Sequence, residues 1–198
     1  NMAQQGLFGE VVHTEGAYNH DLRAYCMNDT TGYHDMWRLK YNAAHTGNPY
    51  PTHGLGPIAQ IMNIHRGDKM DYLVSVSSDQ FGLTDAAILH HGPESDFAKR
   101  EYKLGDMNTT IIRTAKGKTI MIQHDVTTPR PYSRIHQVVG TRGFAQKYPI
   151  PQIGLDSVAP EGLNAAEKED LLKRYEHPIT KEYGEKAREV GGLGGMDF

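Results

Sequence analysis

The clearest alternation of apolar and polar positions predicts a β-hairpin near the middle of the chain. Residues 109–114 and 118–125 form two strand-like runs, and Gly117 lies in the short turn between them. Residues 7–18 alternate more weakly but carry paired valines, and residues 136–140 form another short apolar run. We therefore expect four strands in these regions.

A fifth strand is predicted over residues 71–78. Tyr72, Val74 and Val76 occupy every second position, which places them on one face of an extended chain. This spacing predicts a half-buried strand.

Three segments carry helix signals. Residues 57–64 begin with proline and have apolar residues at helical spacing, which predicts a helix that starts at the proline. Residues 164–175 begin with Asn164 and carry Glu167 three positions later, the pattern of a capping box. Residues 179–190 are rich in charge and predict a second, solvent-exposed helix.

Polar stretches separate these elements. Residues 19–56 are rich in Gly, Asn, Thr and His and predict a long irregular loop with a functional role. The Pro-rich residues 148–160 predict a connector, and residues 191–195 a loop. Residues 1–6 resemble the last turn of a helix closed by glycine, and an apolar element starts near residue 196, so we expect a chain cut at both ends.

Together these elements predict an α+β domain, with an open, mainly antiparallel β-sheet and flanking helices. No Gly-x-Gly-x-x-Gly turn follows a strand, so the chain shows no dinucleotide-binding fingerprint, the mark of a Rossmann domain.

Composition narrows the class of protein. The 198 residues suffice for one domain with a real core, and 38% hydrophobic residues is ordinary for a globular chain. A net charge of -3 with scattered Lys and Arg gives no argument for nucleic acid. No stretch approaches the ~20 apolar residues of a membrane span. A single cysteine, Cys26, excludes an internal disulfide framework.

The unusual feature is the presence of 11 histidines and 11 tyrosines. Many fall in three clusters, over residues 16–23, residues 37–38 with 48–57, and residues 127–134. Each cluster lies where a predicted strand or loop meets another element, which is where sites are built on a scaffold. Tyr and His can transfer protons, and Arg suits an anionic or polyhydroxyl ligand. The pattern indicates a polar pocket fit for proton transfer on a sugar.

Spacing alone leaves competing interpretations open. One alternative for residues 50–53 is a rigid turn that merely caps the next helix. One alternative for residues 130–132 is a turn with a packed aromatic ring. A metal site is the sharper rival, although no spacing among its candidate ligands matches a strong metal motif. Those candidates are His20, Asp21, His53, His90, His91 and His124. The adjacent His90 and His91 lie in a polar stretch and are expected to be exposed.

Other catalytic classes have no support in the sequence. A serine nucleophile would need a Gly-x-Ser-x-Gly elbow, which is missing, and Cys26 has no recognisable catalytic setting. A conventional glycosidase needs two facing carboxylates, and nothing singles out such a pair.

Six runs, in this order, resemble glycoside hydrolase family 109 of the Gfo/Idh/MocA oxidoreductase-like group. They are GEVVH at residues 9–13, GAYNHDLR at 16–23, YPTHGLGP at 50–57, NIHRGD at 63–68, RPYS at 130–133 and GGMDF at 194–198. Each run alone is weak, but the combination is specific and spans essentially the whole chain. Two departures concern sugar specificity: Leu193 stands where the family often has His, and the segment between Arg23 and Trp37 is shorter than in some members.

The resemblance implies a fold and an activity. Residues 1–198 would be the substrate-binding, oligomerising C-terminal domain, and an upstream Rossmann domain would hold NAD. The family's activity is that of an α-N-acetylgalactosaminidase. NAD+ takes hydride from C3 of the sugar, a base removes the acidified C2 proton, the aglycone leaves from C1, water adds, and NADH returns the hydride. No carboxylate pair is needed for this chemistry.

The resemblance also implies site residues. Tyr18 matches the family's pocket tyrosine and is the candidate for proton transfer at C2. Arg38 and Tyr132 match substrate-binding residues. Tyr50, Pro51, Thr52 and His53 match a substrate-binding turn, with His53 the candidate acid–base group for the C3 hydroxyl. No metal is implied.

Two other functions compete with this one. One is a sugar dehydrogenase of the same group, and the other is a non-catalytic sugar-binding or dimerisation domain. Related oxidoreductases often pair through the face of the open sheet, so we expect a homo-oligomer built on residues 71–78 and 109–125. Family members are bacterial and often exported, but the chain itself gives no localisation.

Overall fold

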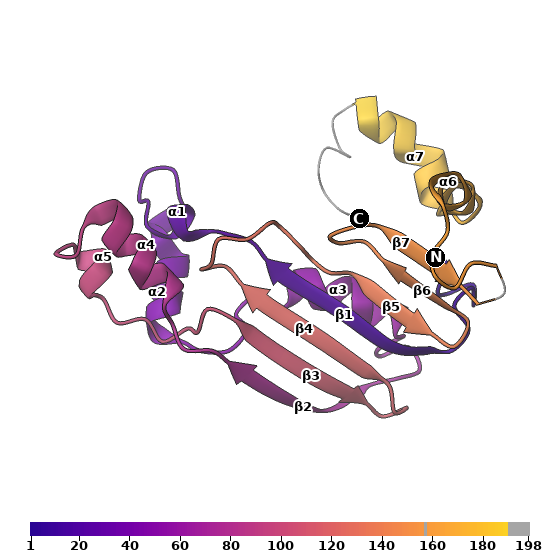
Figure 1. Ribbon diagram of the computed structural model, residues 1–198, viewed down its shortest axis with the longest axis horizontal. Helices are drawn as coiled ribbons and strands as arrows, with labels where there is room; N and C mark the ends of the chain where they lie inside the picture. Colours follow the sequence, from indigo (N-terminus) through magenta and orange to yellow (C-terminus); the bar gives the residue numbers. More distant parts are fainter. Residues whose placement is uncertain (157, 190–198) are drawn as a thin grey trace.

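A seven-stranded open sheet organises the structure, a computed structural model that describes residues 1–156 and 158–189. The strand order is β2-β3-β4-β1-β5-β6-β7, with β1 parallel to β4 and every other neighbouring pair antiparallel. The strands are β1 (Val11–Asn19), β2 (Met70–Ser77), β3 (Asn108–Thr114), β4 (Thr119–Asp125), β5 (Gln137–Gly140), β6 (Gly143–Gln146) and β7 (Gln152–Leu155). The fold class predicted from the sequence is confirmed (Figure 1).

One face of the sheet is covered by helix α3 (Thr52–Ile61), which runs behind β1 in Figure 1. Ile112, Ile120 and Ile122 of the predicted hairpin form a core with Ile58 of this helix and with Met62, which follows its last residue. All five side chains are at most 4% exposed. The hairpin is confirmed, and its two strands alternate buried and more exposed positions because successive side chains point to opposite faces.

The carboxyl ends of β1 and β4 face a lobe of short helices (Figure 1). They are α1 (Arg23–Cys26), the 3-10 helix η1 (His34–Met36), α2 (Trp37–Ala44), α4 (Gly82–His91) and α5 (Asp96–Lys99). This lobe has its own core, in which Leu39 and Leu83 are fully buried. The expectation of an irregular loop over residues 19–56 is therefore wrong, because tertiary burial of residues such as Leu39 orders helices that have no strong local signal.

At the other end, the β5–β7 meander lies beside α6 (Ala165–Arg174) and α7 (Pro178–Glu189) (Figure 1). The capping box predicted at Asn164 and Glu167 is present, and α7 is largely exposed as expected. The prediction of a plain connector over residues 148–160 is wrong, since β7 adds an edge strand there. The short strand β7 is held by backbone pairing with β6 and has no long apolar pattern, so its signal in the sequence is weak.

The first residues form the expected glycine-closed turn. Gly6 has φ 76°, its N–H donates to the carbonyl of Ala3 at 3.0 Å, and the N–H of Leu7 donates to that of Met2 at 3.1 Å. This pair of bonds is the Schellman pattern of a helix end. The predicted features over residues 191–198, Leu193 among them, lie outside the described residues.

Two predicted boundaries are also wrong. Helix α3 starts at Thr52 rather than at Pro57, which lies inside the helix, and it ends at Ile61. The earlier start follows from tertiary packing of the first turn on β1, described below. β1 begins at Val11, four residues after the predicted start of the strand.

Strand β2 is not half-buried. Tyr72, Leu73, Val74 and Val76 are 60, 58, 62 and 66% exposed, so both faces of this edge strand are open. The alternating pattern identified the strand correctly, but an apolar face needs a neighbour to bury it. None of the described residues covers this one. Among residues 1–156 and 158–189, every helix falls short of the length and apolar character that a membrane span requires.

Candidate active site

Tyr18 lies at the centre of a cluster of rings at the carboxyl end of β1. Its side chain is 8% exposed. Its ring centroid lies 4.8 Å from that of His53 and 5.2 Å from that of Tyr50, and both contacts are edge-on. The Tyr50 and His53 rings are themselves 5.0 Å apart. Three residues that the sequence placed on two separate segments thus meet at one point.

Two glycines explain why these segments meet. Gly16 of β1 and Gly54 of α3 lie against each other: a Cβ at Gly16 would be 2.5 Å from the Gly54 carbonyl oxygen, and one at Gly54 would be 2.8 Å from the Ala17 nitrogen. Only glycine allows a helix and a strand to approach so closely without displacement. The first turn of α3 is therefore pressed onto the end of β1, which sets His53 beside Tyr18.

A second side of the cluster comes from the segment after β4. Tyr132 packs edge-on against His20, with ring centroids 4.9 Å apart, and lies 6.4 Å from Tyr18. The Tyr132 hydroxyl accepts a hydrogen bond from Nε of Arg134. His20 Nδ1 lies 3.3 Å from the Tyr18 hydroxyl oxygen. This arrangement joins the ends of β1 and β4 through ring and hydrogen-bond contacts.

Arg38 is a buried cation beside this cluster. Its side chain is 3% exposed, and the guanidinium carbon lies 4.9, 4.6 and 5.6 Å from the ring centroids of Tyr33, Trp37 and Tyr50. The aromatic faces stabilise the positive charge. Its Nε and Nη1 atoms have no hydrogen-bond partner among the described residues. Because buried donors are normally satisfied, these atoms suit an acceptor that a ligand or water brings.

Burial shifts the pKa values of the cluster in opposite directions. It raises the pKa of Tyr18 to about 12, and the Arg38 charge opposes this only partly. Burial lowers the pKa of His53 below its usual range, helped by Arg134 and His20. Burial also lowers the pKa of His20, against the pull of Asp21. At neutral pH the site therefore holds a protonated phenol between neutral imidazoles.

His124 is a further imidazole under the cluster. It is the ladder partner of Tyr18 on β4, it is 1% exposed, and its ring centroid lies 6.3 Å from that of Tyr18. Burial, followed by the charge of Arg38, lowers its pKa to about 4, so it stays neutral. Its Nε2 atom finds no hydrogen-bond partner within residues 1–156 and 158–189.

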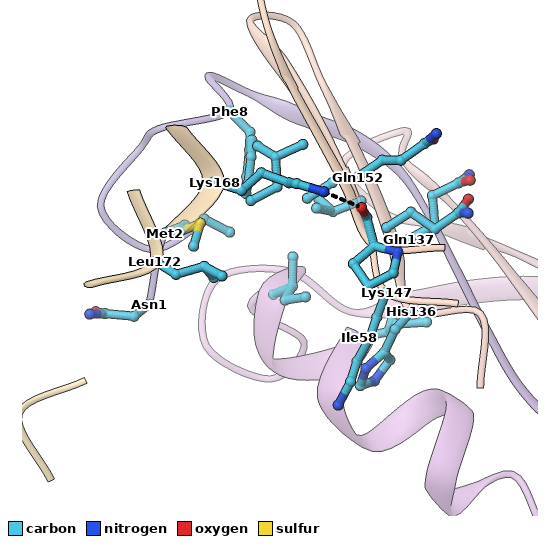
Figure 2. A pocket seen from close by; sticks show the side chains of 17 residues that line it. Asn1, Met2, Phe8, Ile58, His136, Gln137, Lys147, Gln152, Lys168 and Leu172 are labelled. Atoms are coloured by element: carbon cyan, nitrogen blue, oxygen red, sulfur yellow. Dashed lines mark hydrogen bonds between the residues drawn. The ribbon is translucent and has the colours of Figure 1, made fainter. Parts of the chain in front are cut away.

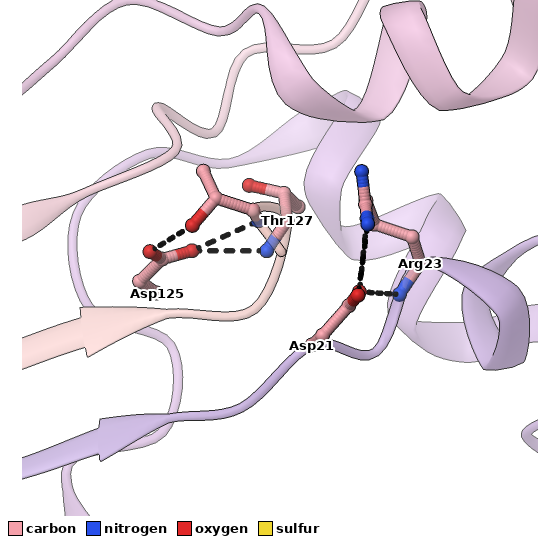
Figure 3. A network of polar contacts seen from close by, with 5 residues as sticks. Asp21, Arg23, Asp125 and Thr127 are labelled. Carbon is pink, nitrogen blue, oxygen red and sulfur yellow. Dashed lines mark hydrogen bonds and ion pairs between the residues drawn. The ribbon is translucent and has the colours of Figure 1, made fainter. Parts of the chain in front are cut away.

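The nearby carboxylates are engaged in structural contacts. Asp125 accepts backbone hydrogen bonds from Thr127 and Thr128, and Asp21 accepts three hydrogen bonds from Arg23 (Figure 3). Each closes the turn that follows its strand, as short Asp side chains commonly do. Neither therefore resembles one of two facing catalytic acids.

The geometry also bears on two other kinds of site, a metal site and a cysteine nucleophile. In residues 1–156 and 158–189, no group of three or more His, Cys, Asp or Glu side chains lies close enough to hold a metal ion. His90 and His91 are exposed, as predicted. Cys26 is fully buried, and burial raises the pKa of its thiol to about 12, which leaves almost no thiolate for nucleophilic attack.

The structure brings Tyr18, Arg38, Tyr50, His53 and Tyr132 together. Pro51 and Thr52 are exposed at the start of α3, and in the part of the chain that the structure describes no side chain caps that helix.

Sequence reasoning placed His20 in the 16–23 cluster and named it, like His124, as a possible metal ligand, yet the rings of both lie beside that of Tyr18. The period of a strand was a usable signal for His20, which follows Tyr18 by two positions and so shares its side. His124 required the parallel register of β1 and β4, which no local pattern reveals.

A cavity of about 550 Å³ lies elsewhere, between the β5–β7 meander, α3 and α6 (Figure 2). Its walls are mainly apolar, from residues such as Phe8, Ile58 and Leu172, and Lys168 on its rim donates to the Pro151 carbonyl at 3.0 Å. It contains none of the seven site residues predicted from the sequence. The Tyr18 cluster, which holds all the titratable residues of the predicted site, is therefore kept as the candidate active site.

The fold matches that of solved oxidoreductases. A levoglucosan dehydrogenase in complex with NADH and L-sorbose has a TM-score of 0.54 and 18% identity, over 79% of this chain and 39% of that chain. An NAD-binding oxidoreductase from Klebsiella pneumoniae has a TM-score of 0.51 and 16% identity, over 79% of this chain and 38% of that one. At such identities the likeness shows the fold alone.

The family follows from sequence. The family model described as "Glycosyl hydrolase 109, C-terminal domain" matches residues 1–198, and the chain belongs to that family. It is 57% identical over 189 residues to an alpha-N-acetylgalactosaminidase of Bacteroides fragilis, covering 94% of this chain and 44% of that protein. It is 55% identical over 190 residues to glycosyl hydrolase family 109 protein 2 of Phocaeicola vulgatus, covering 95% of this chain and 46% of that protein. The chain thus spans less than half the length of these relatives.

Proposed function

We propose that this domain is the substrate-binding part of a longer, NAD-dependent glycosidase that cleaves α-linked N-acetylgalactosamine. The observation that carries the proposal is the contact between Tyr18 and His53, with ring centroids 4.8 Å apart, beside the buried Arg38. The family membership and the named relative support the substrate class.

NAD+, when bound, supplies reversible oxidation at C3 of the sugar. The described residues contain no glycine-rich turn between a strand and a helix of the kind that holds a dinucleotide, so we assign none of them to the cofactor. In our proposal the cofactor is held by a separate domain, and this chain binds the sugar and moves its protons.

Each site residue has a distinct task in this proposal. His53, neutral at neutral pH because burial lowers its pKa, accepts the proton of the C3 hydroxyl. Tyr18 transfers the proton at C2. Arg38 donates from its unpartnered Nε and Nη1 to oxygen acceptors of the sugar, and Tyr50 and Tyr132 form aromatic walls. Pro51 and Thr52 hold the turn that presents His53.

The test uses the full-length protein that carries this domain. Release of p-nitrophenol from its α-N-acetylgalactosaminide is followed together with NADH absorbance. We expect release without net NADH, because the hydride returns to the sugar. Tyr18→Phe and His53→Ala should each lower turnover by ~10²–10⁴-fold if these groups transfer protons. Losses under tenfold would remove them from those roles, and NADH accumulation with free sugars would indicate a dehydrogenase instead.

We also propose that two copies associate through the open face of the sheet. Val74 and Ile111 are directly paired on β2 and β3 and are 62 and 54% exposed, so their apolar side chains face solvent on a sheet edge. Sedimentation should give a homo-oligomer, and Val74→Lys should weaken it. The matched control is Ile179→Lys, because Ile179 is an exposed apolar residue of α7, and this helix lies on the β7 side of the sheet, opposite the β2 edge (Figure 1). A monomer at high concentration would contradict this proposal.

A further inference from the structure

The Tyr18 hydroxyl lies close to a ring nitrogen of His20. Its oxygen lies 3.3 Å from Nδ1 of His20, within hydrogen-bond reach. The two side chains share a side of the extended chain because they are two positions apart. Tyr132 also packs edge-on against the imidazole, with ring centroids 4.9 Å apart, and limits its orientation.

We propose that His20 is the proton partner of Tyr18: its Nδ1 accepts the phenolic proton when the Tyr18 oxygen takes up a proton from the sugar. This inference rests on the proposed function, because it assigns a partner to the proton transfer at that site. His20 acts through Tyr18 and is therefore a positioning residue rather than a group that contacts the substrate.

Transfer of the phenolic proton to His20 avoids the buried phenolate that Tyr18 would otherwise form. A phenol with a pKa near 12 is a very weak acid, so an isolated phenolate in this setting is costly. In the coupled transfer the O–H bond of Tyr18 breaks as an N–H bond forms on His20, and a new O–H bond forms with the proton that leaves C2 of the sugar. The electron pair of that C–H bond stays on the sugar as the enolate of its C3 ketone. Tyr18 ends neutral, and the positive charge resides on the His20 imidazolium. The reverse transfer restores both groups.

The surroundings of His20 fit this role. Burial keeps its pKa below the usual value, so it is neutral and able to accept a proton at neutral pH. Asp21 stabilises the His20 imidazolium, whereas Arg38 destabilises it. A positive charge on His20 in turn lowers the pKa of His53. His124, by contrast, is 1% exposed and more strongly held neutral. His20 is only half-buried, so it can exchange its proton with solvent.

The contact is tested in this chain without any activity. If the phenol donates to Nδ1, neutral His20 must carry its proton on Nε2. Long-range proton–nitrogen NMR at pH 8 should show His20 in that tautomer. In Tyr18→Phe the population of the other tautomer should rise several-fold. Tyr50→Phe, which leaves the Tyr18 hydroxyl in place, is the matched control and should leave the tautomer unchanged. A protonated Nδ1 in the unaltered chain, or no change in Tyr18→Phe, would overturn the inference.

The transfer is tested in the full-length enzyme. His20→Ala should lower turnover by about 10²-fold, as expected for loss of a positioned proton-transfer group. Added imidazole should restore part of that loss, which it would not do for a purely structural histidine. His90→Ala, on the exposed end of α4, controls for loss of a histidine elsewhere. Full activity in His20→Ala, or no rescue by imidazole, would refute the relay. If the unaltered enzyme released no p-nitrophenol while the NMR result held, the proposed function would fail and the hydrogen bond would stand.

Discussion

The close packing of α3 on β1 leads to a sharp prediction for two glycines of the same helix. Gly54 and Gly56 both lie in α3, and neither has a left-handed φ. A Cβ at Gly56 would meet nothing within 4 Å, whereas a Cβ at Gly54 would lie 2.8 Å from the backbone nitrogen of Ala17. Replacement by alanine therefore has the same helical benefit at both positions but a steric penalty at only one.

The magnitudes separate the two variants. Alanine is better than glycine in a helix by about 1 kcal/mol. Gly56→Ala should therefore raise the free energy of unfolding by up to that amount. Overpacking a rigid contact costs about 1–3 kcal/mol, so Gly54→Ala should be neutral or destabilised by as much as about 2 kcal/mol. The difference between the variants isolates the penalty, because their helical contributions cancel.

Urea denaturation, monitored by circular dichroism, gives the free energy of unfolding of each variant. In a chain of this size, a loss of 1 kcal/mol corresponds to roughly 2–4 °C in Tm. If Gly54→Ala and Gly56→Ala stabilised the protein equally, the close approach of α3 and β1 would be wrong. The same displacement should carry His53 away from Tyr18, so Gly54→Ala should also reduce turnover in the full-length enzyme, while Gly56→Ala should not.

Two further predictions concern stability. Asn164→Ala removes the side chain that caps α6 through the Glu167 N–H and should lower the free energy of unfolding by about 1 kcal/mol, whereas Asn164→Asp should retain most of it; equal losses in urea denaturation would contradict the capping role. The pKa of His124 is about 4 in the folded protein and near 6.5 when unfolded, so the unfolded chain binds more protons between these values. Stability should therefore be fully present above pH 6.5 and fall as the pH drops toward 4, by up to about 1.4 kcal/mol per pH unit. His124→Gln should flatten this dependence, and an unchanged slope in denaturation curves between pH 4.5 and 7 would show that other groups cause it.

The sequence determined the features that depend on nearby residues. The hairpin of β3 and β4, the capping box of α6 and the glycine-closed first turn each rest on a few consecutive residues, and the structure has all three. The family also followed from short motifs in a fixed order. Such features are readable because the backbone hydrogen bonds and caps involved lie within a few positions of one another.

The tertiary structure alone decided how the site is assembled. The parallel pairing of β1 and β4 sets His124 beneath Tyr18, and the contact of Gly16 with Gly54 brings in His53 from a segment that the sequence presents as a loop. Burial then shifts the pKa values of these groups, and the lack of a described neighbour leaves β2 exposed. Each of these outcomes depends on residues far apart in the chain, because packing distance and solvent exclusion are properties of the folded molecule and not of any local pattern.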